Sequence, residues 1–111
     1  MSERQERIGK TEALFRDVNE RIAEATDRFD ASEAEFMCEC ADPACVERLE
    51  VSLAEYEEVR EEPTQFLLDP AHVKPDVERI VERRRGYAIV EKFDDVVAHV
   101  VRQLDPRAEP A

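Results

Sequence analysis

Apolar side chains recur along the N-terminal part of the chain at the spacing of a long helix. The seam consists of Ile8, Phe15, Ile22 and Phe29, seven positions apart, with Val18 and Ala25 between them. This pattern predicts a helix over residues 3–30, with glutamate and arginine on its opposite side. The seam covers only about three heptads, which is short for an independent coiled coil. We therefore expect the helix to pack on the rest of the domain, with a homodimer or capture of a partner helix as the alternative.

A different period begins after the cysteine-rich segment. Residues 48–53 alternate between polar and apolar side chains, which is the period of a strand. Residues 52–55 read Ser-Leu-Ala-Glu, a capping box, and predict a short helix over residues 53–61. Asp-Pro at residues 42–43 is also a good helix start, because proline in the first turn needs no N–H donor. A single helix over residues 43–61 is therefore the alternative to this strand and helix.

The C-terminal half predicts a hairpin and a last helix. Strands are expected over residues 64–68, 78–83 and 87–93, and Gly86 allows the positive φ of a tight hairpin turn between the second and third. The last strand is apolar at consecutive positions and should be buried on both faces. An aspartate at position 94 or 95 caps a helix whose valines follow one face as far as residue 104.

These elements predict an α+β fold. The long N-terminal helix packs on a small, mainly antiparallel sheet, and a zinc-knuckle-like cysteine loop joins the two. A chain of 111 residues is sufficient for one domain, which we place at residues 1–104. Residues 105–111 contain two prolines and three charged side chains, and we expect them to form a flexible tail.

The charge balance bears on the choice of partner. With 28 acidic and 16 basic residues the net charge is −12, so the chain repels phosphate backbones and nucleic acid is an unfavourable partner. A protein partner with a basic or helical surface suits this charge better. No apolar run is long enough to span a membrane, and no apolar signal region follows the N-terminus. We therefore expect a cytoplasmic protein, in which thiols stay reduced.

All three cysteines of the chain, Cys38, Cys40 and Cys45, fall within eight residues. A thiolate cluster of this kind can hold a soft metal such as zinc if a fourth donor comes from elsewhere. Two histidines are available, and we choose His72 because it lies in a loop bracketed by prolines. His99 lies on the predicted last helix and points away from the valine face. The predicted zinc ligands are therefore Cys38, Cys40, Cys45 and His72.

Two other interpretations of the cysteines stay open. The thiols could stay reduced and pack as small apolar groups, or they could act in redox chemistry, with Cys45 resolving a Cys38–Cys40 disulfide. A set of three cysteines and one histidine is closed and typical of structural zinc, so no catalytic residue is assigned. The function predicted first is a non-catalytic, zinc-stabilised interaction or regulatory module. A thiol-based redox sensor is second and a metal-dependent enzyme third.

The order of several motifs resembles that of one protein family. Cys-Glu-Cys at residues 38–40, with Cys45, precedes Glu-Tyr-Glu-Glu-Val-Arg at residues 55–60 and then His72. This order is similar to a family of small uncharacterised proteins of high-GC Gram-positive bacteria, whose hallmark is a Cys-Glu-Cys segment before a Glu-Tyr-Glu-x-Val-Arg helix. The resemblance covers most of residues 12–93. It implies that the three cysteines and His72 form one site, and it implies no particular activity.

Overall fold

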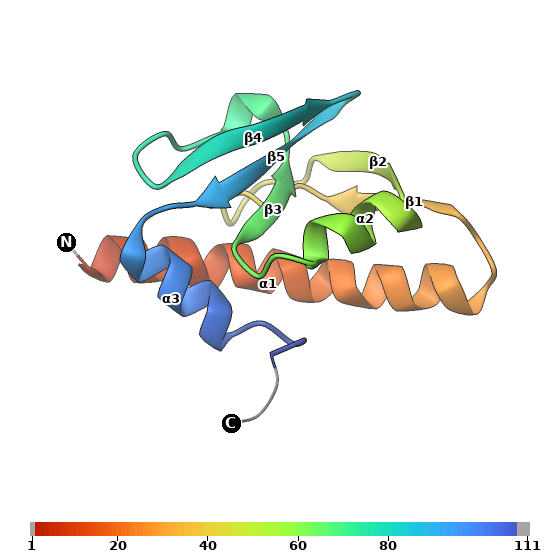
Figure 1. Ribbon diagram of the computed structural model, residues 1–111, viewed down its shortest axis with the longest axis horizontal. Helices are drawn as coiled ribbons and strands as arrows, with labels where there is room; N and C mark the ends of the chain where they lie inside the picture. The colour runs from red at the N-terminus through yellow and green to blue at the C-terminus, as the bar shows by residue number, and fades with distance from the viewer. Residues whose placement is uncertain (1, 109–111) are drawn as a thin grey trace.

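The computed structural model describes residues 2–108 and shows the predicted α+β fold (Figure 1). In chain order the elements are α1 (Ser2–Arg28), β1 (Glu33–Met37), β2 (Arg48–Ser52), α2 (Leu53–Arg60), β3 (Gln65–Leu68), the 3-10 helix η1 (Pro70–His72), β4 (Glu78–Arg84), β5 (Tyr87–Lys92) and α3 (Asp95–Gln103). β1 and β2 form an antiparallel hairpin, and β3, β5 and β4 form an antiparallel sheet in that order. The long helix α1 runs beneath both sheets.

The start of α2 is set by the capping box at Ser52. The Glu55 backbone N–H donates to Ser52 Oγ at 3.1 Å, and the Ser52 N–H donates back to Glu55 Oε1 at 3.3 Å. Strand and helix therefore separate at this residue, and the single helix over residues 43–61 is wrong. The preceding strand β1 was not predicted: its alternating run of polar and apolar side chains is short, and the strand is defined by its antiparallel pairing with β2.

The buried face of α1 differs from the predicted seam. Ile8 and Phe15 are buried as expected, but Val18 and Phe29 are 39% and 77% exposed. The face that packs on the domain is shifted around the helix and carries polar groups; its buried members are Ile8, Glu12, Ala13, Phe15, Arg16, Asn19, Ala23 and Thr26. The apolar seam therefore located α1 correctly and oriented it only in part.

Two charged residues of this face find partners deep in the domain. Lys92 of β5 bonds Glu12 Oε2 at 2.7 Å and also contacts the carboxylate of Glu78 on β4. Arg16 donates to the backbone carbonyls of Pro63 at 2.6 Å and Val101 at 2.7 Å. Charges are buried at tolerable cost only when they are paired or hydrogen-bonded. These bonds therefore tie α1 to the larger sheet and to α3.

Two glycines have distinct structural roles. Gly86 lies in the turn between β4 and β5 with φ of 87°, as the hairpin prediction requires. Gly9 lies where α3 crosses α1, and a Cβ at this position would lie 2.8 Å from Val100 Cγ1. Only glycine therefore allows this close approach of the two helices.

The segment after α3 is folded back on the domain. Asp105 is nearly buried and pairs with Arg60, and Arg107 pairs with Glu57 at 2.8 Å and with Glu20. Both residues belong to the segment 105–111, which the sequence predicts as a flexible tail. In the structure, these ion pairs hold the start of that segment on the domain. The rest of the predicted tail, residues 109–111, lies outside the described residues.

The buried carboxyl of Glu12 predicts a pH dependence of stability. Burial raises the pKa of Glu12 from 4.5 to about 7, against the opposing charge of Lys92. Between these values the folded state keeps a proton that the unfolded chain has released. The free energy of unfolding contributed by this group is therefore complete below about pH 4.5 and falls by about 3 kcal/mol as the pH rises to about 7.

Urea unfolding of the wild type and E12Q across this pH range checks the expectation. The glutamine cannot ionise, so the difference between the two stability curves should change with pH. Glu6→Gln, on the exposed part of the same helix, should run parallel to the wild type. A pH-independent difference between E12Q and the wild type would contradict the raised pKa of Glu12.

Candidate metal centre

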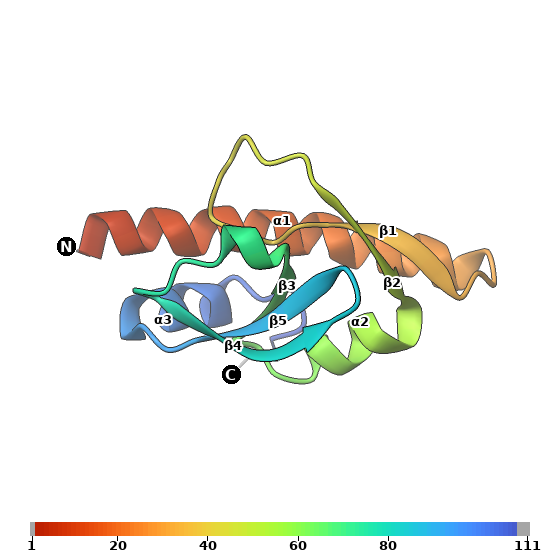
Figure 2. The same cartoon turned by 90° about the horizontal axis from the view of Figure 1, so that it is seen from above.

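Three separate segments bring the predicted ligands together. Cys38 and Cys40 follow β1, Cys45 precedes β2, and His72 ends η1. In Figure 2 the loop between β1 and β2 lies next to η1, over the middle of α1. The three sulfur atoms and a ring nitrogen of the histidine all lie within 4.8 Å of one another. The arrangement could therefore hold a metal ion, while the assignment of each residue as a ligand stays a prediction.

Glu39, between the first two cysteines, fixes the direction of their side chains. Its carboxylate is buried and accepts from the Leu67 backbone N–H at 3.0 Å and from Asn19 Nδ2 at 2.8 Å. Its own N–H donates to the Leu67 carbonyl at 2.9 Å. Successive side chains of an extended chain point to opposite sides. With Glu39 anchored inward, Cys38 and Cys40 therefore both point to the other side, where the cluster forms.

A tight turn, not a helix, returns Cys45 to the cluster. The Cys45 N–H donates to the Asp42 carbonyl at 3.0 Å, and Asp42 Oδ1 accepts from the Ala44 N–H at 2.9 Å. The helix start expected at Pro43 is therefore wrong. The aspartate side chain caps this turn in the same way that it would have capped a helix, so the local signal fits both structures.

Asp69 positions the histidine and one of the sulfurs. Its side chain accepts from the Ala71 N–H at 2.9 Å, and its carbonyl accepts from the His72 N–H at 2.8 Å. The Asp69 N–H donates to Cys38 Sγ at 3.2 Å. One residue therefore shapes η1 and supplies a backbone donor to the Cys38 sulfur of the cluster. Sequence reasoning missed both Asp69 and Glu39, although a glutamate between two cysteines and an Asp-Pro dipeptide were visible signals.

Two distances between the histidine and the sulfurs match those around a tetrahedral ion. His72 Nδ1 lies 3.4 Å from Cys38 Sγ and 3.6 Å from Cys45 Sγ. A zinc ion with ordinary Zn–S and Zn–N bond lengths would place sulfur and nitrogen ligands about 3.6 Å apart. All three cysteines are free thiols and buried. The donor set therefore fits a soft metal in its chemistry, and its two short nitrogen–sulfur distances match zinc bond lengths.

The thiols of the cluster differ in acidity. The pKa of Cys40 is lowered to about 5, chiefly by a hydrogen bond from Cys38, with a backbone hydrogen bond at Asp42 contributing. The pKa of Cys38 is raised, mainly because its proton is held in that bond to Cys40, and burial raises the pKa of Cys45. Metal binding must release the protons that remain on Cys38 and Cys45, so affinity falls as the pH falls.

The surroundings of the cluster are open on one side. A cleft of about 200 Å³ adjoins it, lined by Cys40, Ala41, Asp42, Ala71, His72, Val73 and Lys74. His99, the histidine that was not chosen, is exposed on α3 and is not part of the cluster. His72 therefore lies beside the cysteines and His99 does not.

Comparison of the chain with protein-family models, with curated proteins and with solved structures finds no match. The resemblance to the Gram-positive family therefore stays a prediction. None of the helices within residues 2–108 combines the length and apolar character needed to cross a membrane.

The geometry predicts unequal effects for the two histidines. His72→Ala should weaken metal affinity by more than the roughly 10–100-fold that loss of an outer partner costs, because a donor itself is removed. The same change should lower the melting temperature of the metal-loaded protein, whereas His99→Ala should alter neither property. Competition with a chromophoric chelator and thermal unfolding measure both. Equal effects of the two substitutions would reject His72 as a ligand.

Proposed function

We propose that the protein is a non-catalytic, zinc-stabilised protein-interaction or regulatory module. The observation that carries the proposal is the convergence of three sulfurs and one imidazole nitrogen within 4.8 Å. Zinc is the metal that we expect, because it favours tetrahedral sets of cysteine and histidine and undergoes no redox change. Sulfur donors also disfavour magnesium and calcium, which prefer oxygen.

The position of the cluster supports a structural role for the metal. The cysteines lie within the loop between the strands of a two-stranded hairpin, and His72 comes from the connection between β3 and β4. An isolated two-stranded hairpin is marginally stable in water. A metal bound at both places would tie the hairpin to the larger sheet and add its binding free energy to the stability of the folded state.

A closed ligand set supports the non-catalytic reading. With three thiolates and one imidazole, all four tetrahedral positions come from the protein, and a substrate or water would have to displace one of them. Three thiolates also lower the Lewis acidity of the ion. A metal-dependent enzyme is therefore the less favoured use of this cluster.

The expected partner is a protein. The net charge of −12 favours a partner with a basic surface over nucleic acid. The apolar seam of α1 suits a helical partner, and we expect the setting to be cytoplasmic. A groove between α1, α2 and the segment after α3 has four acidic side chains in its lining, of which Glu20 and Glu57 pair with Arg107 of the same groove. It is lined by Glu20, Ala23, Glu24, Asp27, Leu53, Glu57, Pro106 and Arg107.

Metal content measured on protein purified without chelator tests the proposal. Elemental mass spectrometry should find about one zinc per chain, with thiols that titrate only after denaturation or chelation. Removal of the metal by a chelator should lower the melting temperature. Protein without metal whose thiols react freely in the folded state would overturn the proposal.

A thiol-based redox sensor is the second candidate, and one observation favours it. The cleft beside the cluster is lined by Cys40, which gives a small oxidant such as peroxide a route to a sulfur of lowered pKa. Oxidation would remove donors and release the metal. Loss of zinc on treatment with stoichiometric peroxide, restored by a thiol reductant, would support this candidate over a purely structural site.

A further inference from the structure

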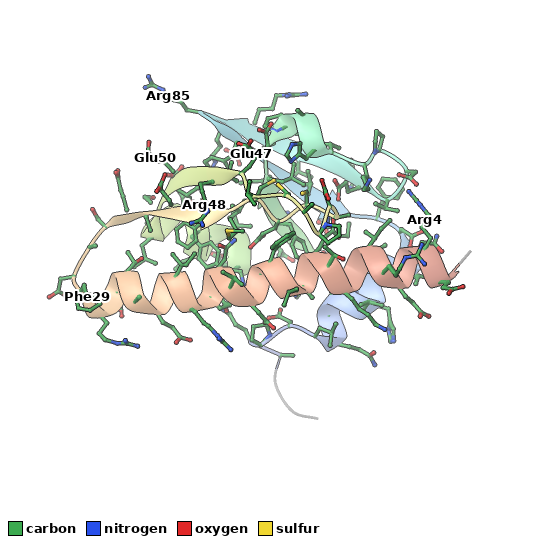
Figure 3. The ribbon with its side chains drawn as sticks, turned by 180° about the vertical axis from the view of Figure 1, so that it is seen from behind. Arg4, Phe29, Glu47, Arg48, Glu50 and Arg85 are labelled. Atoms are coloured by element: carbon green, nitrogen blue, oxygen red, sulfur yellow. The ribbon has the colours of Figure 1, made fainter. Side chains whose placement is uncertain are left out.

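The helix α1 presents a strip of apolar side chains that the domain does not cover. Leu14, Val18 and Phe29 are 61%, 39% and 77% exposed, and Ala25 beside them is half-buried. Figure 3 shows α1 in front of the rest of the molecule on this side, with Phe29 at its C-terminal end. Single exposed apolar side chains are ordinary, whereas several along one helix face indicate an interaction surface.

The spacing of the strip is symmetric. Leu14 and Phe29 lie equally far from the point between Arg21 and Ile22, and so do Val18 and Ala25. A two-fold axis through that point would run a second copy of α1 antiparallel to the first. Leu14 would then face the partner's Phe29, and Val18 would face the partner's Ala25. Such a self-complementary patch is what an isologous dimer requires.

The charges beside the strip are arranged in pairs about a point one residue further along, between Ile22 and Ala23. Asp17, Arg21, Glu24 and Arg28 follow the outer flank of the strip, and within residues 2–108 none of the four makes an ion pair. The antiparallel axis leaves Asp17 and the partner's Arg28, and likewise Arg21 and the partner's Glu24, two residues out of level. This offset is about 3 Å along the helix, which long side chains can span. A parallel pair in register would instead place each charge beside its own copy. Opposite charges across an interface fix its register, and like charges exclude the alternative.

We propose that two copies of this chain associate through an antiparallel pair of α1 helices centred between Arg21 and Ile22. The contact from Leu14 to Phe29 spans about 22 Å of helix. It lies outside the buried face of α1, so each domain keeps its own core. The interface is short, and the dimer is therefore a concentration-dependent one. It does not involve the metal cluster, so its test and that of the zinc-stabilised module can fail separately.

Sedimentation velocity of the full chain over a range of concentrations tests the proposal, with metal-loaded and chelated protein run side by side. Wild type should move from monomer to dimer as the concentration rises. Leu14→Glu should shift this transition at least tenfold upward in concentration, with an unchanged circular-dichroism spectrum. Glu3→Gln, exposed on the first turn of the same helix and outside the strip, is the matched control and should leave the transition unchanged.

A charge exchange separates this arrangement from any other dimer. Asp17→Lys and Arg28→Glu should each weaken association, and D17K/R28E together should restore it, because the two positions meet only across the axis. Within one helix they lie about 16 Å apart and cannot compensate each other. A monomer at every concentration would overturn the proposal. A dimer that L14E leaves intact, or that the double variant fails to restore, would overturn it as well.

Discussion

The burial of polar side chains on one face of α1 is the constraint on which the rest of the structure depends. Glu12 reaches Lys92 on β5, Arg16 reaches carbonyls before β3 and on α3, and Asn19 reaches the end of β1. Each contact joins α1 to a different part of the domain. A buried charge or amide that loses its partner costs more than a lost apolar contact, so these bonds fix the position of the helix strongly.

The geometry of the cluster of three cysteines and His72 depends on this face. Asn19 bonds both the backbone of Met37, where β1 ends, and the carboxylate of Glu39. Glu39 in turn holds the backbone of β3, and its anchored side chain turns Cys38 and Cys40 towards His72. The arrangement of donors thus depends on residues that do not touch the cluster, as is common for metal sites in which outer partners orient the ligands.

The two faces of α1 differ in their side chains and in whether the domain covers them. The inner face buries apolar side chains such as Ile8 and Phe15 beside charged and hydrogen-bonded groups. The outer strip leaves Val18 and Phe29 of the apolar seam exposed. The seam therefore describes the core in part, as in an ordinary amphipathic helix, and in part a face that the domain does not cover.

Local signals in the sequence determined where elements begin and end. The capping box at Ser52, the positive φ of Gly86 and the Asp94 cap of α3 each depend on neighbouring residues only, and each lies where the pattern placed it. The cysteine spacing likewise indicated a cluster, and the choice of His72 over His99 followed from the loop that carries it. Strand β1 was missed because its run is only five residues long, and it is recognised in the structure by its pairing with β2.

Tertiary structure alone decided which face of α1 is buried and how the ligands are oriented. A pattern of apolar positions assigns charged residues to the surface, because burial of a charge is unfavourable without a partner. The partners of Glu12, Arg16 and Glu39 lie from 20 to 85 positions away along the chain, so no local spacing predicts them. The sequence therefore determined the elements and the donor atoms, and the long-range hydrogen bonds determined their arrangement.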